Sequence, residues 1–178
     1  MKTLHEEFEH SEHGSPHSDL ISRCKEVLYR YPSSQHLVNV LNLHHIPVKT
    51  EKADKAGYQV ENNSLITLQY PESNSDNLYE MAIYLGCAIR LVELHLETYL
   101  SPEMKDSRAW LNPHMTESFE VILTICKLAY DMTYDAPNEQ VDAFLDSHGY
   151  RKIYDAYLEK KSFSEIENLM LKSFNARH

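Results

Sequence analysis

Cys87 lies in an apolar segment, and a cysteine thiolate is a side chain that can attack an electrophile or bind a metal. A catalytic cysteine also needs a histidine base and an electropositive setting. The residues one helical turn away from Cys87 are Ile83 and Leu91, and neither is a base. The pattern therefore favours a buried, inert thiol at this position, and we assign no catalytic residue from the sequence.

Four histidines and four glutamates make up much of the first 17 residues, a composition that can bind a transition metal weakly. The histidines are His5, His10, His13 and His17. Their spacing implies no fixed ligand geometry. We therefore expect residues 1–17 to be a flexible, solvated lead-in, and residues 18–178 to form a single globular domain.

Motifs for nucleotide or phosphate chemistry are absent from the sequence. The chain has no Walker loop, no Gly-x-Gly-x-x-Gly, no Gly-x-Ser-x-Gly and no Cys-x-x-Cys, and it contains only four glycines. Glycine-poor sequences rarely build loops that cradle phosphates. The formal net charge of −10 also argues against a nucleic acid as partner.

The compartment is inferred from cysteines and hydropathy. The three cysteines are an odd number, and the N-terminus lacks the apolar run of a signal peptide. No segment approaches the ~20 apolar residues that cross a membrane. We expect an acidic, cytoplasmic protein with reduced thiols and no contact with a membrane.

Helical periodicity dominates the chain outside residues 46–70. Helices are predicted over residues 18–31, 32–45, 77–99, 116–134, 138–147 and 150–160, with a last one opened by a capping box from Ser162 to Glu165. "HIPVKT", residues 45–50, is predicted to be extended because Pro47 bars a helix interior, and residues 57–71 alternate around Asn62-Asn63, which is typical of a hairpin. The sequence thus predicts a mainly helical α+β fold with a small antiparallel sheet.

Two of the predicted helices each carry a polar seam on an apolar background. Residues 77–99 are apolar around most of the helix, as in a central helix covered on several sides. The seam of this helix is Gly86, Arg90, Glu93 and Glu97, and that of helix 116–134 is Glu120, Thr124, Lys127 and Asp131.

The order of elements over residues 33–135 resembles that of small zincin-like domains of the metallopeptidase type. The matching pieces are "LVNVLNLHHIPV", "KAGYQVENNSLITL", "LYEMAIYLGCAIRL" and "TESFEVILTICKLAYD". The resemblance places the family's His-Glu-x-x-His on Cys87, Ala88 and Leu91, and its downstream glutamate ligand on Glu120. Catalytic zinc needs three protein ligands and a base. The resemblance therefore implies an inactive domain that holds no metal or other cofactor and acts as a binding or regulatory module.

The tyrosines point to a partner without identifying it. Twelve are present, and Tyr150, Tyr154 and Tyr157 share one helical face, which suits either an interface or core packing. We expect another protein as partner and leave a homo-oligomer open. Two further functions remain open: a small acidic adaptor, immunity or inhibitor protein with an unrelated helical fold, and a hydrolase with ligands that the sequence does not reveal.

Overall fold

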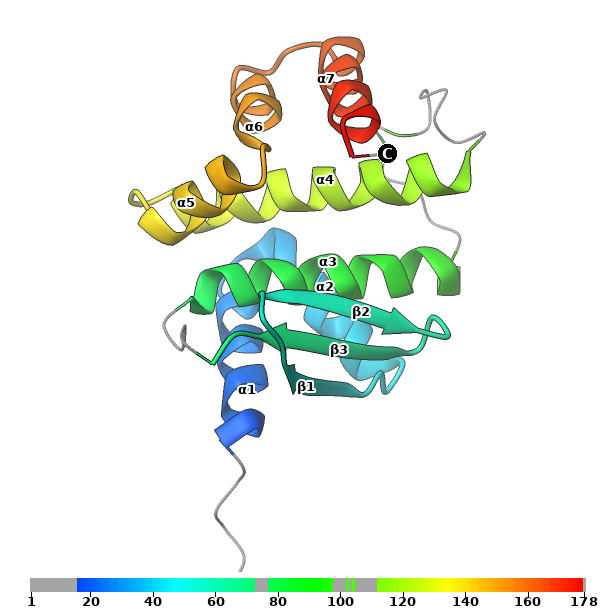
Figure 1. Cartoon of the computed structure of the whole chain (residues 1–178), viewed down its shortest axis with the longest axis vertical. Coiled ribbons are helices and arrows are strands. Elements are labelled where there is room, and N and C mark those ends of the chain that lie inside the picture. Colours follow the sequence, from blue (N-terminus) through cyan, green and yellow to red (C-terminus); the bar gives the residue numbers. More distant parts are fainter. Residues whose placement is uncertain (1–15, 73–76, 98–101, 103, 105–111, 178) are drawn as a thin grey trace, which may run out of the picture.

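The computed structural model describes residues 16–72, 77–97, 102, 104 and 112–177. Within these ranges the chain forms seven helices and three strands, a mainly helical α+β fold (Figure 1). The helices are α1 (Pro16–Tyr29), α2 (Pro32–Leu43), α3 (Leu78–Glu97), α4 (Pro113–Thr133), α5 (Glu139–Ser147), α6 (Arg151–Leu158) and α7 (Phe163–Asn175). The strands are β1 (Val48–Lys52), β2 (Gly57–Glu61) and β3 (Leu65–Tyr70).

Strands β2 and β3 form the predicted antiparallel hairpin, with Tyr58 opposite Leu68. The turn between them places both Asn62 and Asn63 at positive φ, at 50° and 56°. Asparagine tolerates this left-handed conformation better than most residues, and tight hairpin turns require it. The hairpin prediction is confirmed.

The prediction of a wholly antiparallel sheet is wrong, because β1 pairs with β3 in parallel. The strand order is β1-β3-β2, and Val48 lies opposite Ile66. A parallel pair needs a long connection between its two strands. Here the connection between β1 and β3 contains strand β2. The chain forms the two edge strands, β1 and β2, first, and β3 then lies between them. Alternation of apolar residues reveals a strand's faces but not its neighbours.

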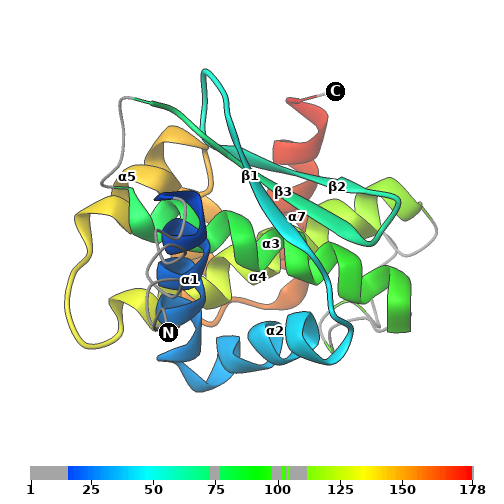
Figure 2. The ribbon, with the colours of Figure 1, turned by 90° about the horizontal axis from the view of Figure 1, so that it is seen from below.

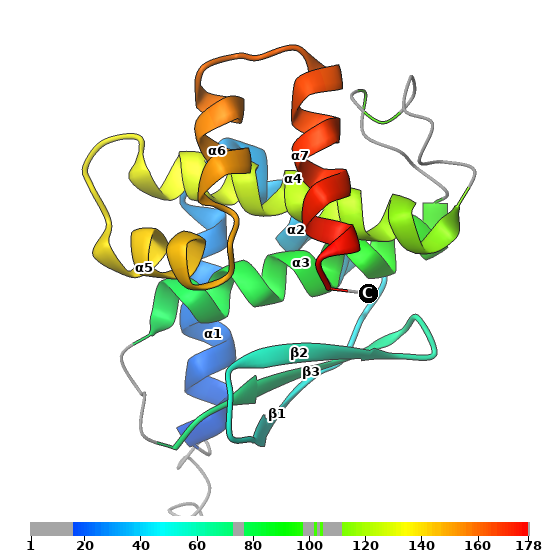
Figure 3. The same ribbon diagram turned by 45° about the horizontal axis from the view of Figure 1, so that its top comes forward.

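Helix α3 is the centre of the molecule, as its nearly all-round apolar pattern predicted. It packs against β2 and β3 on one side and against α4 on the other, while α1 and α2 cover a third side (Figures 1 and 2). Leu85 and Ile89 of α3 are completely buried. Helices α6 and α7 lie across α4 on the side away from α3 (Figure 3).

Local signals fix the ends of several helices. The Asn112 side chain accepts from the backbone N–H groups of His114 and Met115 at 3.1 and 3.3 Å, so α4 begins at Pro113 rather than at the predicted residue 116. The capping box between Ser162 and Glu165 is confirmed.

The predicted lead-in lies mostly outside the described residues, which exclude 1–15. Helix α1 begins at Pro16, two residues before the predicted start of the domain. Proline suits the first turn of a helix, because its missing N–H would have no partner there. Among the helices that the structure describes, none combines the length and apolar character needed to span a bilayer.

Candidate functional site

Two cavities flank the packed pair of helices α3 and α4. The first, here called the strand cavity, has a volume of about 250 Å³ and opens beneath strand β2. Its walls include Tyr58, Leu91, Glu117, Ile122, Tyr150 and Arg177, which come from β2, α3, α4, the start of α6 and the end of α7.

The structure brings only part of the predicted ligand set to the strand cavity. Leu91 lines it, while Cys87 and Ala88 are buried in the core with 1% and 0% of their surface exposed. Glu120 is not there, because its carboxylate binds Arg90 in the second cavity. The carboxylate that does line the strand cavity is Glu117, which lies 3.1 Å from His95 Nε2. The sequence missed Glu117 because the choice between two glutamates three residues apart depends on the rotation of α4.

Neither the predicted ligand positions on α3 nor the walls of the strand cavity fit a zinc centre. Zinc binds a thiolate, but burial raises the pKa of the Cys87 thiol well above its usual value and keeps it protonated. Leu91 has no donor atom. Within the described ranges, no group of three or more histidine, cysteine, aspartate or glutamate side chains is placed to hold a metal ion.

The tyrosines that line this cavity are neutral side chains packed against the core. Burial raises the pKa of the Tyr58 and Tyr150 phenols, so both stay neutral. Arg177 closes the cavity by donating from Nη1 to the Tyr150 hydroxyl at 2.7 Å. Tyr150 and Tyr154 are only 7% and 4% exposed, and Tyr157 is partly buried against the core. The core-packing alternative therefore describes Tyr150 and Tyr154.

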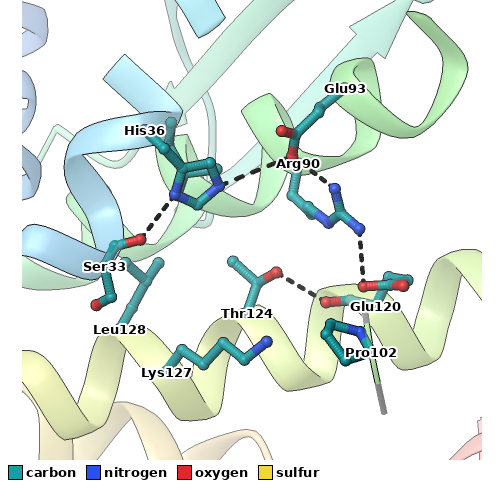
Figure 4. A pocket seen from close by; sticks show the side chains of 10 residues that line it. Ser33, His36, Arg90, Glu93, Pro102, Glu120, Thr124, Lys127 and Leu128 are labelled. Carbon is teal, nitrogen blue, oxygen red and sulfur yellow. Dashed lines mark hydrogen bonds and ion pairs between the residues drawn. The ribbon is translucent and has the colours of Figure 1, made fainter. Parts of the chain in front are cut away.

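The second cavity, here called the charged cavity, has a volume of about 390 Å³. It forms where the polar seams of α3 and α4 face each other, and α2 closes one side (Figure 4). Its polar walls are Ser33, His36, Arg90, Glu93, Glu120, Thr124 and Lys127. The sequence showed both seams but gave no sign that they meet.

One arginine holds two carboxylates together in the charged cavity. Arg90 Nη1 lies 2.6 Å from Glu93 Oε2, and Arg90 Nη2 lies 3.1 Å from Glu120 Oε2. The side chains of the three residues are only 6%, 9% and 1% exposed. Thr124 donates its hydroxyl to the Glu120 backbone carbonyl at 2.8 Å. The charges are therefore fixed in position and largely withdrawn from water.

His36 stands at the mouth of the charged cavity, with 56% of its side chain exposed. Its Nδ1 lies 2.8 Å from the Ser33 carbonyl oxygen, which can only accept, so Nδ1 carries the proton. Its Nε2 lies 3.8 Å from Glu93 Oε2. The sequence missed His36 because the apolar residues of α2 indicate which side is buried but not which helix covers it.

A second histidine, His148, lies beside a serine and a tyrosine but is not a catalytic base. Its Nδ1 is 2.9 Å from the Phe144 carbonyl oxygen, which requires a proton on Nδ1, and its Nε2 is 2.9 Å from the Tyr84 hydroxyl. Ser147 Oγ contacts that same Nδ1 at 2.9 Å, so His148 cannot take its proton. The cluster instead satisfies the end of helix α5.

No family model, no curated protein and no solved structure matches this chain.

Proposed function

We propose that the chain is a catalytically inactive zincin-like domain that binds another protein. The observation that supports this most is the position of α3 beneath β2, the antiparallel edge strand of the sheet. The residues that would carry zinc chemistry on this helix, Cys87, Ala88 and Leu91, are a protonated thiol and two hydrocarbons. In this proposal, the domain has the arrangement of a zincin helix and edge strand and lacks the donor atoms that bind zinc.

Strand β2 offers the surface on which a partner would bind. In the described sheet β2 pairs with β3 alone, so one side of its backbone is available for hydrogen bonds. Its side chains alternate, with Tyr58 and Val60 packed against the core and Gln59 exposed. An exposed edge next to a cavity suits an extended segment of a partner, which adds a strand to the sheet and places a side chain in the cavity.

Measurements of zinc content and of casein cleavage test the proposal that the domain is inactive. The full chain should hold no stoichiometric zinc once His5, His10, His13 and His17 are replaced by alanine, and it should not cleave casein with zinc in excess. The histidine replacements remove weak zinc binding by residues 1–17, so any zinc that remains is bound by the domain. One tightly held zinc per chain in that variant, with casein cleavage, would overturn the proposal.

Site-specific cross-linking tests the partner surface. Gln59→Cys on β2 and Glu51→Cys on the opposite edge strand β1 place matched exposed thiols for a photo-cross-linker. The three native cysteines are buried and should stay unlabelled. We expect a protein captured from position 59 and not from position 51, and a second copy of the chain would identify the partner as itself. Equal capture at both positions would refute binding along β2.

A further inference from the structure

The charged cavity lies on the opposite side of the α3–α4 pair from β2, and the proposed function does not use it. Arg90, Glu93 and Glu120 are buried there, and apart from Thr124 the other buried residues of these two helices are apolar or glycine. Apolar side chains of similar size stabilise such a position as well as a buried ion-pair network does, or better. Natural chains depart from the apolar pattern mainly at sites of function. The charges therefore point to a ligand.

The balance of charge in the cavity limits the ligand class. Two carboxylates, from Glu93 and Glu120, and two basic side chains, from Arg90 and Lys127, line the cavity, with His36 at its mouth. A phosphate or a dicarboxylate would meet two buried negative charges, and a polyamine would meet two positive ones. A small molecule with one charge of each sign fits the balance.

The acidic and basic side chains share one region of the cavity (Figure 4). A carboxylate has about four acceptor sites, so Glu93 and Glu120 can bind Arg90 and also accept from a ligand ammonium group. Lys127 follows Glu120 by two helical turns, and its side chain runs back along α4 toward Thr124 (Figure 4). Its ammonium group thus extends toward the Glu120 end of the cavity, so a ligand there meets a cation and carboxylates together, which suits the adjacent ammonium and carboxylate of an α-amino acid.

The remaining wall is apolar, because Leu37 and Leu128 line it. The volume of about 390 Å³ equals that of roughly a dozen waters at ~30 Å³ each. This matches the non-hydrogen atoms of a medium-sized amino acid with a few waters. We propose that the charged cavity binds a free α-amino acid with an aliphatic side chain, whose ammonium is held by Glu93 and Glu120 and whose carboxylate is held by Lys127.

Calorimetry on the full chain tests this ligand class directly. The probes are leucine, valine and isoleucine at millimolar concentrations, together with two analogues of leucine: isopentylamine, which lacks the carboxylate, and 4-methylpentanoate, which lacks the amine. We expect at least one amino acid to bind, and both analogues to bind tenfold or more weakly, since each loses a hydrogen-bonded charge pair.

Variants assign the binding to this cavity. Lys127→Met keeps the side-chain length and removes the ammonium, so it should weaken the amino acid tenfold or more and leave isopentylamine unchanged. Thr124→Leu fills the cavity and should abolish binding. The matched control is Lys25→Met, because Lys25 lies on α1 and does not line this cavity. Thermal melts show that each variant is folded.

Four outcomes would overturn the proposal. They are no binding by any of the amino acids, equal binding by isopentylamine, equal binding by 4-methylpentanoate, and amino-acid binding that survives both Lys127→Met and Thr124→Leu. None of these depends on zinc or on cross-linking at Gln59, so the proposed function and this inference can fail separately.

Discussion

Replacing Arg90 with methionine tests whether one guanidinium holds the two polar seams together. The change keeps most of the side-chain volume and leaves Glu93 and Glu120 buried as like charges. Their Oε2 atoms contact the same guanidinium at 2.6 and 3.1 Å, so they lie within roughly 8 Å of each other. Two like charges at ~8 Å repel by about 2 kcal/mol at an effective dielectric constant near 20.

The loss of the hydrogen bonds to Arg90 adds to this repulsion. We expect Arg90→Met to lower the free energy of unfolding by about 3–5 kcal/mol, the usual cost of removing one partner from a buried pair. Adding Glu120→Gln removes one of the two like charges and should recover part of the loss. Urea unfolding, followed by circular dichroism, measures the free energy of unfolding of the single and the double variant. The comparison requires that the denaturant slope m is the same for both.

Arg151 supplies the matched control for this experiment. It also binds two carboxylates, those of Asp142 and Asp146, each at 2.8 Å, but at the surface. Arg151→Met should therefore cost less than about 1 kcal/mol. A loss below ~1 kcal/mol for Arg90→Met, or no recovery on adding Glu120→Gln, would refute the reasoning.

Three further predictions follow from single contacts. Cys87 should resist iodoacetamide in the native protein at neutral pH and react only on unfolding, because its thiol is buried and its pKa is raised; mass spectrometry of the labelled peptide checks this, and rapid native labelling would contradict it. Gly86→Ala should destabilise the protein although alanine favours helices, because a Cβ at this position would lie 2.5 Å from Leu128 Cδ1. Adding Leu128→Val to Gly86→Ala should recover part of that loss in urea melts. A gain in stability from Gly86→Ala alone would show that Leu128 moves aside at little cost and would contradict the prediction. Burial raises the pKa of the Asp131 carboxyl in the folded protein above its value of ~4 in the unfolded chain. The charged carboxylate therefore lowers the free energy of unfolding as the pH rises from the unfolded pKa to the folded pKa, and the full loss is present above the folded pKa. Asp131→Asn should therefore raise the melting temperature at pH 7 but not at pH 3, and an equal change at both pH values would show that charge is not the cause.

The sequence predicted the elements that depend on neighbours along the chain. The positive φ angles of Asn62 and Asn63 and the capping box at Ser162 are set by a few adjacent residues, so their patterns were sufficient. The central place of α3 followed from its nearly complete apolar surface. These features need no knowledge of other elements.

Features that depend on how elements rotate or pair in space could not be predicted. The parallel pairing of β1 with β3 leaves no mark on the apolar alternation of either strand. Helical spacing places Glu117 and Glu120 on neighbouring faces of α4, but only the packing of α4 on α3 decides which one reaches the strand cavity. His36 was missed for the same reason, because it reaches the charged cavity from a third helix.

The strand order β1-β3-β2 has a consequence for synthesis on the ribosome. Strands β1 and β2 leave the exit tunnel first, and in the final sheet they pair with β3 but not with each other. Until β3 emerges, neither strand has its native partner, and α3, which covers the apolar face of the sheet, is still unmade. The nascent chain therefore passes through an interval in which two strands are open to wrong pairing, and a pause in translation before β3 would lengthen that interval.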